Sequence, residues 1–233
     1  MTQPNDIVVR DLVVDHAAAS GTVRALDHVS LDIDGGSSLA VMGPSGCGKS
    51  TLLGLLAGLA LPTSGSVSIG GRTISELPER DRVRFRRQAL GMVYQADNLL
   101  PHLTVEENVG LQLAICRRDM SGAEHDDPTT LLERLGLGGL ARRFPDQLSG
   151  GQRQRVAVAR AIVHRPVLIL ADEPTGALDE ENARAVIELL VEVQREIGAT
   201  FVLVTHDPHI ASHADRRLEL SRAHQALEGS HAG

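Results

Sequence analysis

Residues 43–51, GPSGCGKST, are the stretch that decides the fold, because they fit the spacing G-x-x-x-x-G-K-[S/T] between two recognisable elements. The continuous apolar run SLAVM, residues 38–42, predicts a buried strand before them. Residues 49–59, KSTLLGLLAGL, carry apolar side chains at helical spacing and predict a helix after them. A strand, a glycine-rich turn and a helix in this order indicate a parallel α/β core.

The chemistry expected of this turn is phosphate binding. Glycines allow backbone N–H groups to converge on phosphate oxygens, and the following helix adds the positive end of its dipole. Lys49 is expected to reach the β- and γ-phosphates and Ser50 to bind Mg²⁺. Cys47 is interpreted as filler in the loop. The predicted nucleotide contacts are Gly43, Pro44, Ser45, Gly46, Cys47, Gly48, Lys49, Ser50 and Thr51.

Two later apolar strands end in side chains that suit phosphoryl transfer. VLILADE, residues 167–173, ends in Asp172 and Glu173. The carboxyl ends of strands border the ligand crevice in α/β folds, so one carboxylate can hold Mg²⁺ and its neighbour can orient or deprotonate a water. TFVLVTHD, residues 200–207, brings His206 to a similar position, where it could contact a γ-phosphate or a water. An ordinary pair of acids at a strand end is the alternative, which the phosphate-binding turn disfavours.

The rest of the chain divides into a β-rich start and a helical middle. Alternating residues in 7–14 and 28–34 predict half-buried strands that pair antiparallel. Thr104 and Glu107 have capping-box spacing and predict a helix over 105–117. The predicted organisation is one domain over 1–233, with a nucleotide-binding core and β subdomain at 1–95 and 159–220, a helical lobe at about 96–158 and a flexible tail at 221–233.

Composition narrows the class of partner. The 233 residues are 42% hydrophobic, which is enough to bury a core as one domain. The 30 acidic and 23 basic residues give a net charge of −7. This balance argues against nucleic acid as the main partner, because phosphate backbones are bound through excess Lys and Arg. The local basic run RVRFRR, residues 82–87, is interpreted as a solvated helix face.

Cysteine content and the first residues bear on location. Only Cys47 and Cys116 are present, which gives neither a disulfide framework nor metal-ligand spacing and favours a reducing compartment. Residues 1–11 lack the charged segment and long apolar run of a signal peptide. No apolar stretch approaches the ~20 residues needed to span a bilayer, so any function at a membrane is expected to require a membrane-embedded partner.

A second glycine turn, LSGGQ at residues 148–152, opens another predicted helix. With it, residues 8–220 resemble the ATP-binding subunits of ABC transporters. The matching motifs, in the family's order, are GPSGCGKST (Walker A), Gln95 in VYQ (Q-loop), LSGGQ (signature), LILADE (Walker B), GALD ending at Asp179 (D-loop) and His206 (switch histidine). The fold implied is α/β, a RecA-like P-loop NTPase core with an antiparallel β subdomain and an inserted α-helical lobe.

The resemblance implies ATP hydrolysis, with ATP and Mg²⁺ bound by the chain. Glu173 would be the general base, and His206 would contact the γ-phosphate. Gln95 would sense Mg²⁺ and the attacking water and link to a transmembrane partner. The implied catalytic set is Glu173, His206, Lys49 and Gln95, and the implied metal set is Ser50, Gln95 and Asp172.

The resemblance also implies two partners. The signature turn would lie far from the chain's own Lys49 and reach the ATP of a second copy packed head to tail, with Asp179 across the interface. The other partner would be an integral membrane permease, which would hold the chain at the cytoplasmic, inner face of the cell membrane. The residues implied to contact the second copy's ATP are Ser149, Gly150, Gly151 and Gln152.

The sequence between the motifs narrows the group within the family. QADNLLPHLTVEENV, residues 95–109, and LADEPTGALD, residues 170–179, are most similar to macrolide exporters, lipoprotein-release complexes and antimicrobial-peptide exporters. Importer subunits for amino acids share much of both stretches, so import stays open. An ATP-switched signalling module that moves no substrate also stays open. DNA-repair and translation members are disfavoured, because the chain has neither a long coiled coil between its halves nor two such domains in tandem.

One departure from the family pattern concerns the adenine base. Family members usually carry an aromatic residue that stacks on adenine, and that position falls at or near His16 here. Imidazole offers less stacking area than a phenol ring, so we expect weaker base selectivity and lower ATP affinity. The alternative is that His16 lies in a mobile loop and touches nothing.

Overall fold

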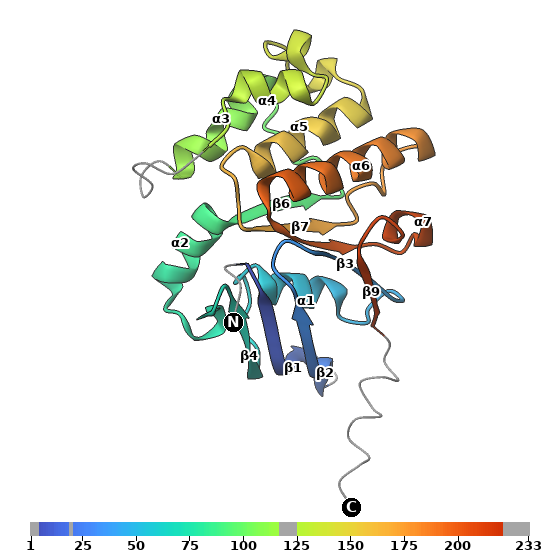
Figure 1. Cartoon of the computed structure of the whole chain (residues 1–233). Coiled ribbons are helices and arrows are strands. Elements are labelled where there is room, and N and C mark those ends of the chain that lie inside the picture. Colours follow the sequence, from blue (N-terminus) through green and yellow to red (C-terminus); the bar gives the residue numbers. More distant parts are fainter. Residues whose placement is uncertain (1–4, 19–20, 117–124, 221–233) are drawn as a thin grey trace, which may run out of the picture.

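Five parallel strands form the central sheet, in the order β6-β7-β8-β3-β9 (Figure 1). β3 precedes the glycine turn, β7 ends in Asp172, and β8 ends two residues before His206. β7 pairs with β8 and β8 with β3, all in parallel. Because adjacent parallel strands end at the same edge of the sheet, this order brings the three motif-bearing strand ends together.

The computed structural model describes residues 5–18, 21–116 and 125–220. The expected flexible tail at 221–233 therefore lies outside the described residues. The strands are β1 (Ile7–Ala18), β2 (Gly21–Ile33), β3 (Ser38–Met42), β4 (Ser64–Ile69), β5 (Arg72–Thr73), β6 (Leu90–Tyr94), β7 (Leu168–Asp172), β8 (Thr200–Val204) and β9 (Arg216–Glu219). The α-helices are α1 (Lys49–Leu56), α2 (Glu79–Ala89), α3 (Val105–Cys116), α4 (Pro128–Arg134), α5 (Gly150–Ile162), α6 (Glu180–Ile197) and α7 (Pro208–Ala211). Short 3₁₀ helices cover Ile74–Glu76, Gly138–Leu140 and Pro145–Gln147.

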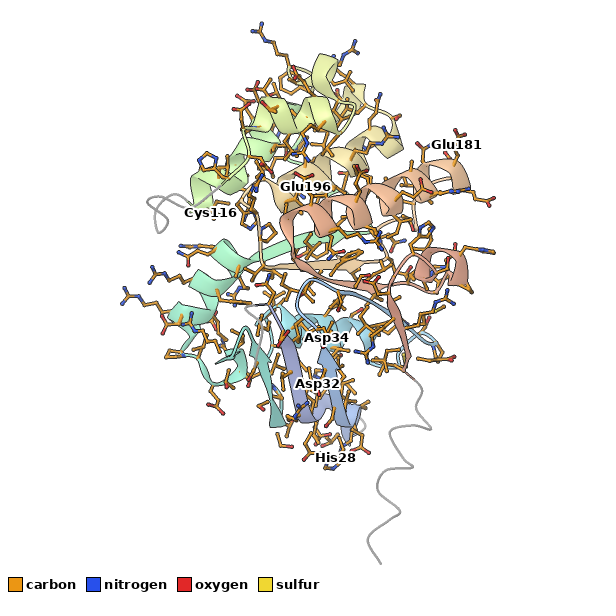
Figure 2. The ribbon with its side chains drawn as sticks, viewed as in Figure 1. His28, Asp32, Asp34, Cys116, Glu181 and Glu196 are labelled. Atoms are coloured by element: carbon orange, nitrogen blue, oxygen red, sulfur yellow. The ribbon has the colours of Figure 1, made fainter. Side chains whose placement is uncertain are left out.

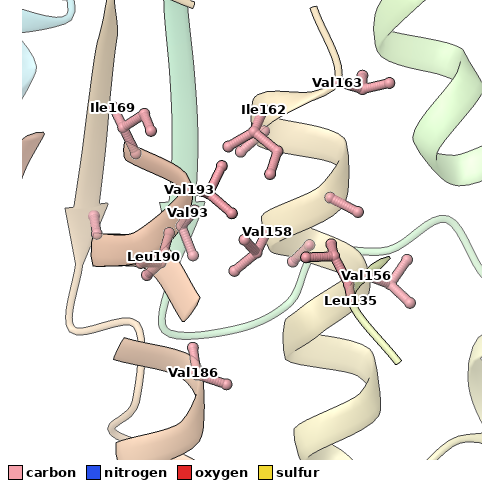
Figure 3. Packing of buried hydrophobic residues seen from close by; sticks show 14 of the residues in the cluster. Val93, Leu135, Val156, Val158, Ile162, Val163, Ile169, Val186, Leu190 and Val193 are labelled. Atoms are coloured by element: carbon pink, nitrogen blue, oxygen red, sulfur yellow. The ribbon is translucent and has the colours of Figure 1, made fainter. Parts of the chain in front are cut away.

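Both faces of the parallel sheet are buried. Ile169 and Ala171 of β7 belong to the hydrophobic cluster that contains α5 and α6, whereas Leu168 and Leu170 belong to the cluster that contains α1 and the antiparallel strands. Successive side chains of a strand point to opposite faces, so burial on both sides explains the unbroken apolar run at the start of the Walker B stretch. Figure 3 shows the packing on the α5 and α6 side, with Val158, Ile162, Leu190 and Val193 among the labelled side chains.

A second, antiparallel sheet has the order β2-β1-β4-β5 and packs on the α1 side. It confirms the predicted antiparallel β subdomain. Asp11 and His28 adopt φ values of 48° and 50° at irregularities in the β1–β2 pairing, and His28 Nδ1 lies 2.6 Å from Asp11 Oδ1. Figure 2 labels His28 at the end of the molecule away from the helical lobe.

The helical middle contains α3, α4 and the first part of α5. The Thr104 backbone N–H donates to Glu107 Oε2 over 2.8 Å, and the Glu107 N–H donates back to Thr104 Oγ1 over 3.3 Å, so the predicted capping box is confirmed. α3 runs from Val105 to Cys116, and residue 117 of the predicted helix lies outside the described residues. The cluster around α5 joins these helices to the sheet.

α5 runs unbroken across residue 158, the expected end of the helical lobe, to Ile162. Its far half packs very closely on β6, because a Cβ built on Gly91 would lie 2.3 Å from the Ala161 carbonyl oxygen. The near half opens at Gly150, within the signature turn. One helix therefore connects the edge of the parallel sheet with the outer lobe.

Two sequence-based expectations about helices need correction. The helix after the glycine turn ends at Leu56 rather than residue 59, because Gly58 adopts the left-handed conformation with φ 64°. The basic run in α2 is only partly a solvated face, since the side chains of Arg82 and Arg86 are 12% and 22% exposed and pair with Glu79. Arg86 also donates to the Gly58 carbonyl over 2.7 Å, so this side chain contacts the end of the segment that follows α1.

No helix within residues 5–18, 21–116 and 125–220 is long and apolar enough to cross a membrane.

Candidate functional site

The glycine turn between β3 and α1 is tightly packed against β2. Gly48 caps α1 with φ 97°, a conformation that side-chain-bearing residues rarely adopt. A Cβ at this position would lie 2.4 Å from the Ala25 carbonyl oxygen of β2. Glycine is therefore required at position 48 both for the backbone conformation and for the space.

Lys49 lies folded over the turn. Its Nζ donates to the Gly43 carbonyl over 2.7 Å and to the Pro44 carbonyl over 2.9 Å, and it lies 4.0 Å from the buried Cys47 Sγ. An ammonium that is held by two neutral carbonyl oxygens can exchange them for phosphate oxygens with a gain in charge complementarity. A hollow of about 170 Å³ beside it is lined by Ala25, Gly46, Gly48, Lys49, Ser50 and Thr51.

Asp172, at the carboxyl end of β7, meets the first turn of α1. Burial raises the pKa of Asp172, and the adjacent charge of Glu173 acts in the same direction, whereas the hydrogen bond from the Ser50 hydroxyl and the charge of Lys49 oppose it. A hydroxyl and a carboxylate at one place, beside a phosphate-binding turn, are the oxygen donors that Mg²⁺ prefers. Ser50 and Asp172 therefore fit a magnesium site by the chemistry of their donors.

Glu173 adopts φ 48° immediately after β7, which is an uncommon conformation for this residue type. Its backbone N–H donates to the Val204 carbonyl over 3.0 Å, and this bond holds the turn at the end of β8. His206 Nδ1 lies 2.9 Å from both Glu173 carboxylate oxygens. The two side chains expected to act on the γ-phosphate end of ATP are thus brought into contact.

Gln95 reaches the same edge of the sheet from the end of β6. A Cβ built on Gly176 would lie 2.9 Å from Gln95 Nε2, so the amide rests directly on the turn that follows Walker B. The Gly176 N–H in turn donates to the Glu173 carbonyl over 3.1 Å. Gln95 is therefore brought close to the Glu173 turn, while its ligation of a metal stays a prediction.

A cleft of about 720 Å³ opens beside these groups. Glu173, Gly176 and His206 line it together with residues from the starts of α6 and α7. The residues that line the hollow at the glycine turn do not line this cleft. The candidate site therefore has two hollows, one at Lys49 and one at Glu173 and His206.

The signature turn is organised by its own side chains. The Ser149 N–H donates to Gln152 Oε1 over 2.9 Å, and the Gln152 N–H donates to Ser149 Oγ over 3.2 Å, which forms a capping box at the start of α5. The S-x-x-Q spacing in the sequence is a signal for this capping box, but the sequence-based interpretation of the two glycines considered only phosphate binding. None of residues 149–152 lines the hollow at Lys49.

Asn182 joins the signature turn to the D-loop of the same chain. A Cβ on Gly151 would lie 2.4 Å from Asn182 Oδ1, and a Cβ on Gly150 would lie 3.6 Å from the Leu178 side chain. Asp179 caps α6 by accepting from the Asn182 N–H over 2.9 Å and from its Nδ2 over 2.7 Å. These bonds lower the pKa of the Asp179 carboxyl, so it stays ionised at this contact.

His16 lies in β1, opposite Val23 of β2, and its side chain is exposed. The alternative expectation that it lies in a mobile loop is wrong, because the strand pairing continues through this position. Val23 is also exposed, and Ala25, two residues further along β2, lines the hollow at Lys49. Stacking of His16 on adenine stays a prediction.

Known proteins similar to this chain point to one family. A sequence model of the family described as ABC transporter matches residues 26–176. The chain is 45% identical over 200 residues to an uncharacterized ABC transporter ATP-binding protein of Mycobacterium tuberculosis, covering 84% of this chain and 79% of that protein. It is 43% identical over 224 residues to the lipoprotein-releasing system ATP-binding protein LolD of Bordetella pertussis, covering 94% and 96%.

Solved structures agree with these sequences. The fold matches a dimeric structure of MJ0796, a bacterial ABC transporter cassette, with a TM-score of 0.80 and 39% identity over 92% of this chain and 94% of that one. A dimeric post-hydrolysis state of the same cassette, bound to ADP and Pi, matches with a TM-score of 0.80 and 38% identity. The chain belongs to the ABC transporter family, as an ATP-binding and ATP-hydrolysing subunit.

Proposed function

We propose that this chain dimerises head to tail around two ATP molecules and drives a separate membrane permease that exports or extracts a peptide, lipoprotein or drug-like substrate. The observation that carries the proposal is the grouping of Ser50, Asp172, Glu173 and His206 where α1, β7 and β8 meet. Ser50 and Asp172 supply oxygen donors that suit Mg²⁺, and the Glu173 carboxylate beside them is held by the His206 imidazole.

Each member of this group has a distinct role in the proposed reaction. Ser50 and Asp172 would hold Mg²⁺, which neutralises phosphate charge when it is bound. Glu173 would accept a proton from the attacking water, and His206 would orient the Glu173 carboxylate by donating from Nδ1 through the observed contact. Lys49 would move from the Gly43 and Pro44 carbonyls to the phosphates, and Gln95 would position the water.

The second copy is proposed because the signature turn has no share in the hollow at Lys49 of the same chain. The start of α5 combines backbone N–H groups with the positive end of a 13-residue helix, which suits a phosphate. In a head-to-tail pair, Ser149, Gly150, Gly151 and Gln152 would contact the other copy's ATP, and Asp179 would lie at the interface. The dimeric form of the similar cassette MJ0796 supports this arrangement.

The permease is proposed to dock beside the stretch that carries Gln95. A groove of about 270 Å³ there is lined by Leu59, Arg86, Tyr94 and Gln112, among others. Leu59 and Tyr94 expose large apolar surfaces next to polar ones, a combination that suits a partner helix. Docking at this groove would hold the chain on the inner face of the membrane. The similarity to LolD supports lipoprotein release as the substrate class.

The dimer is tested with Glu173→Gln, which should retain ATP but stop hydrolysis. We expect this variant to elute as a dimer with ATP and Mg²⁺ on size-exclusion chromatography, whereas Lys49→Ala stays monomeric. Glu192→Gln makes the same chemical change on an exposed turn of α6 and serves as the control. Full turnover in Glu173→Gln would remove Glu173 as general base, and a monomer under all conditions would contradict the shared ATP site.

The membrane partner is tested by capture. A tagged chain should retain an integral membrane permease from solubilised membranes, and a permease with four spans and a large extracytoplasmic domain would favour extraction or mechanical transmission. ATPase activity that is stimulated by the permease while no substrate moves would favour the signalling alternative.

A further inference from the structure

Side chains of α5 hold the stretch of chain that carries Gln95. Gln154, which is 3% exposed, donates from Nε2 to the Tyr94 carbonyl over 2.9 Å. Arg153 Nε donates to Asp97 Oδ2 over 2.9 Å. The two acceptors lie immediately before Gln95 and two residues after it. Bonds from one helix therefore hold the chain on both sides of Gln95, and we call Arg153, Gln154 and Arg160 of this helix the bracket.

Arg160, about two turns further along α5, holds the same stretch of chain. Its two terminal nitrogens donate to the carbonyls of Asn98, over 2.7 Å, and Asp97, over 2.8 Å. Asn98 has φ 50°, so the bond fixes a backbone conformation that is uncommon for residues with a side chain. Burial lowers the pKa of this half-buried arginine, whereas the charge of Asp97 opposes the shift.

We propose that Arg153, Gln154 and Arg160 are positioning residues. They couple the position of Gln95, at the chain's own ATP, to the position of the signature turn, which meets the second copy's ATP. The proposal rests on the head-to-tail dimer proposed above. α5 carries the signature turn at its first residues and the three bracket residues further along. These bonds give a direct route by which a movement of the first turns of α5, on contact with the second copy's phosphate, would reach the backbone on both sides of Gln95.

The chemistry of the bracket favours this role over simple packing. Two of its four bonds come from one guanidinium, whose planar fork can bridge two successive carbonyls, whereas a lysine ammonium presents a single point of charge. Three of the bonds go to backbone carbonyls and one to the Asp97 carboxylate, and none goes to the Gln95 side chain. The amide of Gln95 consequently keeps its place on the Gly176 turn beside Glu173.

The test is a double-mutant cycle on ATP hydrolysis. Arg160→Met keeps most of the aliphatic volume and removes the fork, and Gln95→Ala removes the amide that the fork is proposed to position. We expect each single variant to lower kcat on the order of 10- to 100-fold with little change in ATP affinity. The double variant should be no slower than Gln95→Ala alone, because both changes remove the same contribution.

Further variants separate positioning from folding. Arg153→Met should behave like Arg160→Met. Arg160→Lys keeps the charge but lacks the two separate terminal nitrogens of the guanidinium, so it should recover only part of the activity. Arg134→Gln removes an arginine at the end of α4 that pairs with Glu196 of α6 and should keep nearly full turnover. Thermal unfolding of every variant shows whether a loss of kcat follows a loss of stability.

Failure of the positioning role can be distinguished from failure of the proposed dimer. If Glu173→Gln dimerises with ATP but the Arg160→Met and Gln95→Ala factors multiply, the positioning role is overturned and the dimer stands. If Glu173→Gln stays monomeric with ATP, the dimer is overturned and the positioning role falls with it. Equal kcat values for Gln95→Ala and the double variant, with the dimer present, support the proposal.

Discussion

His206 Nδ1 lies 2.9 Å from both carboxylate oxygens of Glu173, although the His206 side chain is 74% exposed and the Glu173 side chain only 22%. The Glu173 carboxylate is therefore contacted by the largely exposed imidazole ring of His206. Glu173 also has an unusual φ of 48°, and His206 is a side chain that contacts its carboxylate.

We expect His206→Ala to lower ATP turnover on the order of 100-fold while ATP affinity changes little, because the Glu173 carboxylate loses its orienting group. Phosphate release in the steady state and equilibrium nucleotide binding measure the two quantities. His125→Ala, which changes an exposed histidine within the helical lobe, is the control. Normal turnover in His206→Ala would contradict the role assigned to the contact.

Gly48→Ala should abolish nucleotide binding. The new Cβ would approach the Ala25 carbonyl oxygen to 2.4 Å in a backbone region with φ 97°, so the turn must open. Gly110→Ala, in the middle of α3 with nothing within 4 Å, should instead keep binding and stabilise the fold by up to about 1 kcal/mol. Calorimetric ATP titration and urea unfolding distinguish the two effects, and ATP binding by Gly48→Ala would show that the turn tolerates a side chain.

Ser149→Arg should leave ATP binding by the monomer intact but abolish the dimer and hydrolysis. The variant loses the Ser149 half of the capping box and places a long cation where the second copy's phosphate is proposed to lie. Ser149→Asn retains capping ability with a small side chain and controls for damage to α5. Normal hydrolysis by Ser149→Arg would argue that each chain completes its own site.

His16→Tyr should tighten ATP binding by severalfold, because a phenol ring offers more area for stacking on adenine than an imidazole. The exposed position of His16 in β1 leaves room for the larger ring. Titration with ATP and GTP in parallel measures affinity and base selectivity. Unchanged affinity for both nucleotides would count against stacking at this position.

His164 should make the protein sensitive to acid. Burial lowers the pKa of His164 from 6.5 to about 4, while Nε2 contacts the Leu90 carbonyl at 3.2 Å and Nδ1 has no partner among the described residues. The unfolded chain therefore binds a proton that the folded chain resists. The free energy of unfolding should fall by about 3 kcal/mol as pH drops from 6.5 to 4.

His164→Gln removes this titration and keeps a donor for Leu90. Its free energy of unfolding should therefore decline less between pH 6.5 and 4 than that of the unaltered protein. Urea unfolding at several pH values in this window makes the comparison. Parallel curves for the two proteins would mean that other groups dominate acid unfolding.

The sequence predicts those parts of the site that depend on local chemistry. The Walker A turn lies between a strand and a helix as expected, and the strands that precede Glu173 and His206 are neighbours, so their contact follows from parallel-sheet geometry. The antiparallel sheet and the capping box at Thr104 also follow from local patterns.

The contacts that the sequence does not predict join residues far apart in the chain. Arg153 and Arg160 meet a loop more than 50 residues earlier, and nothing in their own neighbourhood specifies that partner. Asn182 has a local signal, because it lies three residues after the helix-capping Asp179, but its contact with Gly151 depends on how two helices pack. The partial burial of Arg82 likewise depends on tertiary structure.

The close approach of Gly91 to the Ala161 carbonyl makes one end of α5 a pivot. A helix whose backbone touches a strand cannot translate there, but it can tilt. Gly150 begins the helix 11 residues before Ala161, about 16 Å away along the axis at about 1.5 Å per residue. A tilt of a few degrees would therefore move the signature turn by about an ångström while the sheet stays still.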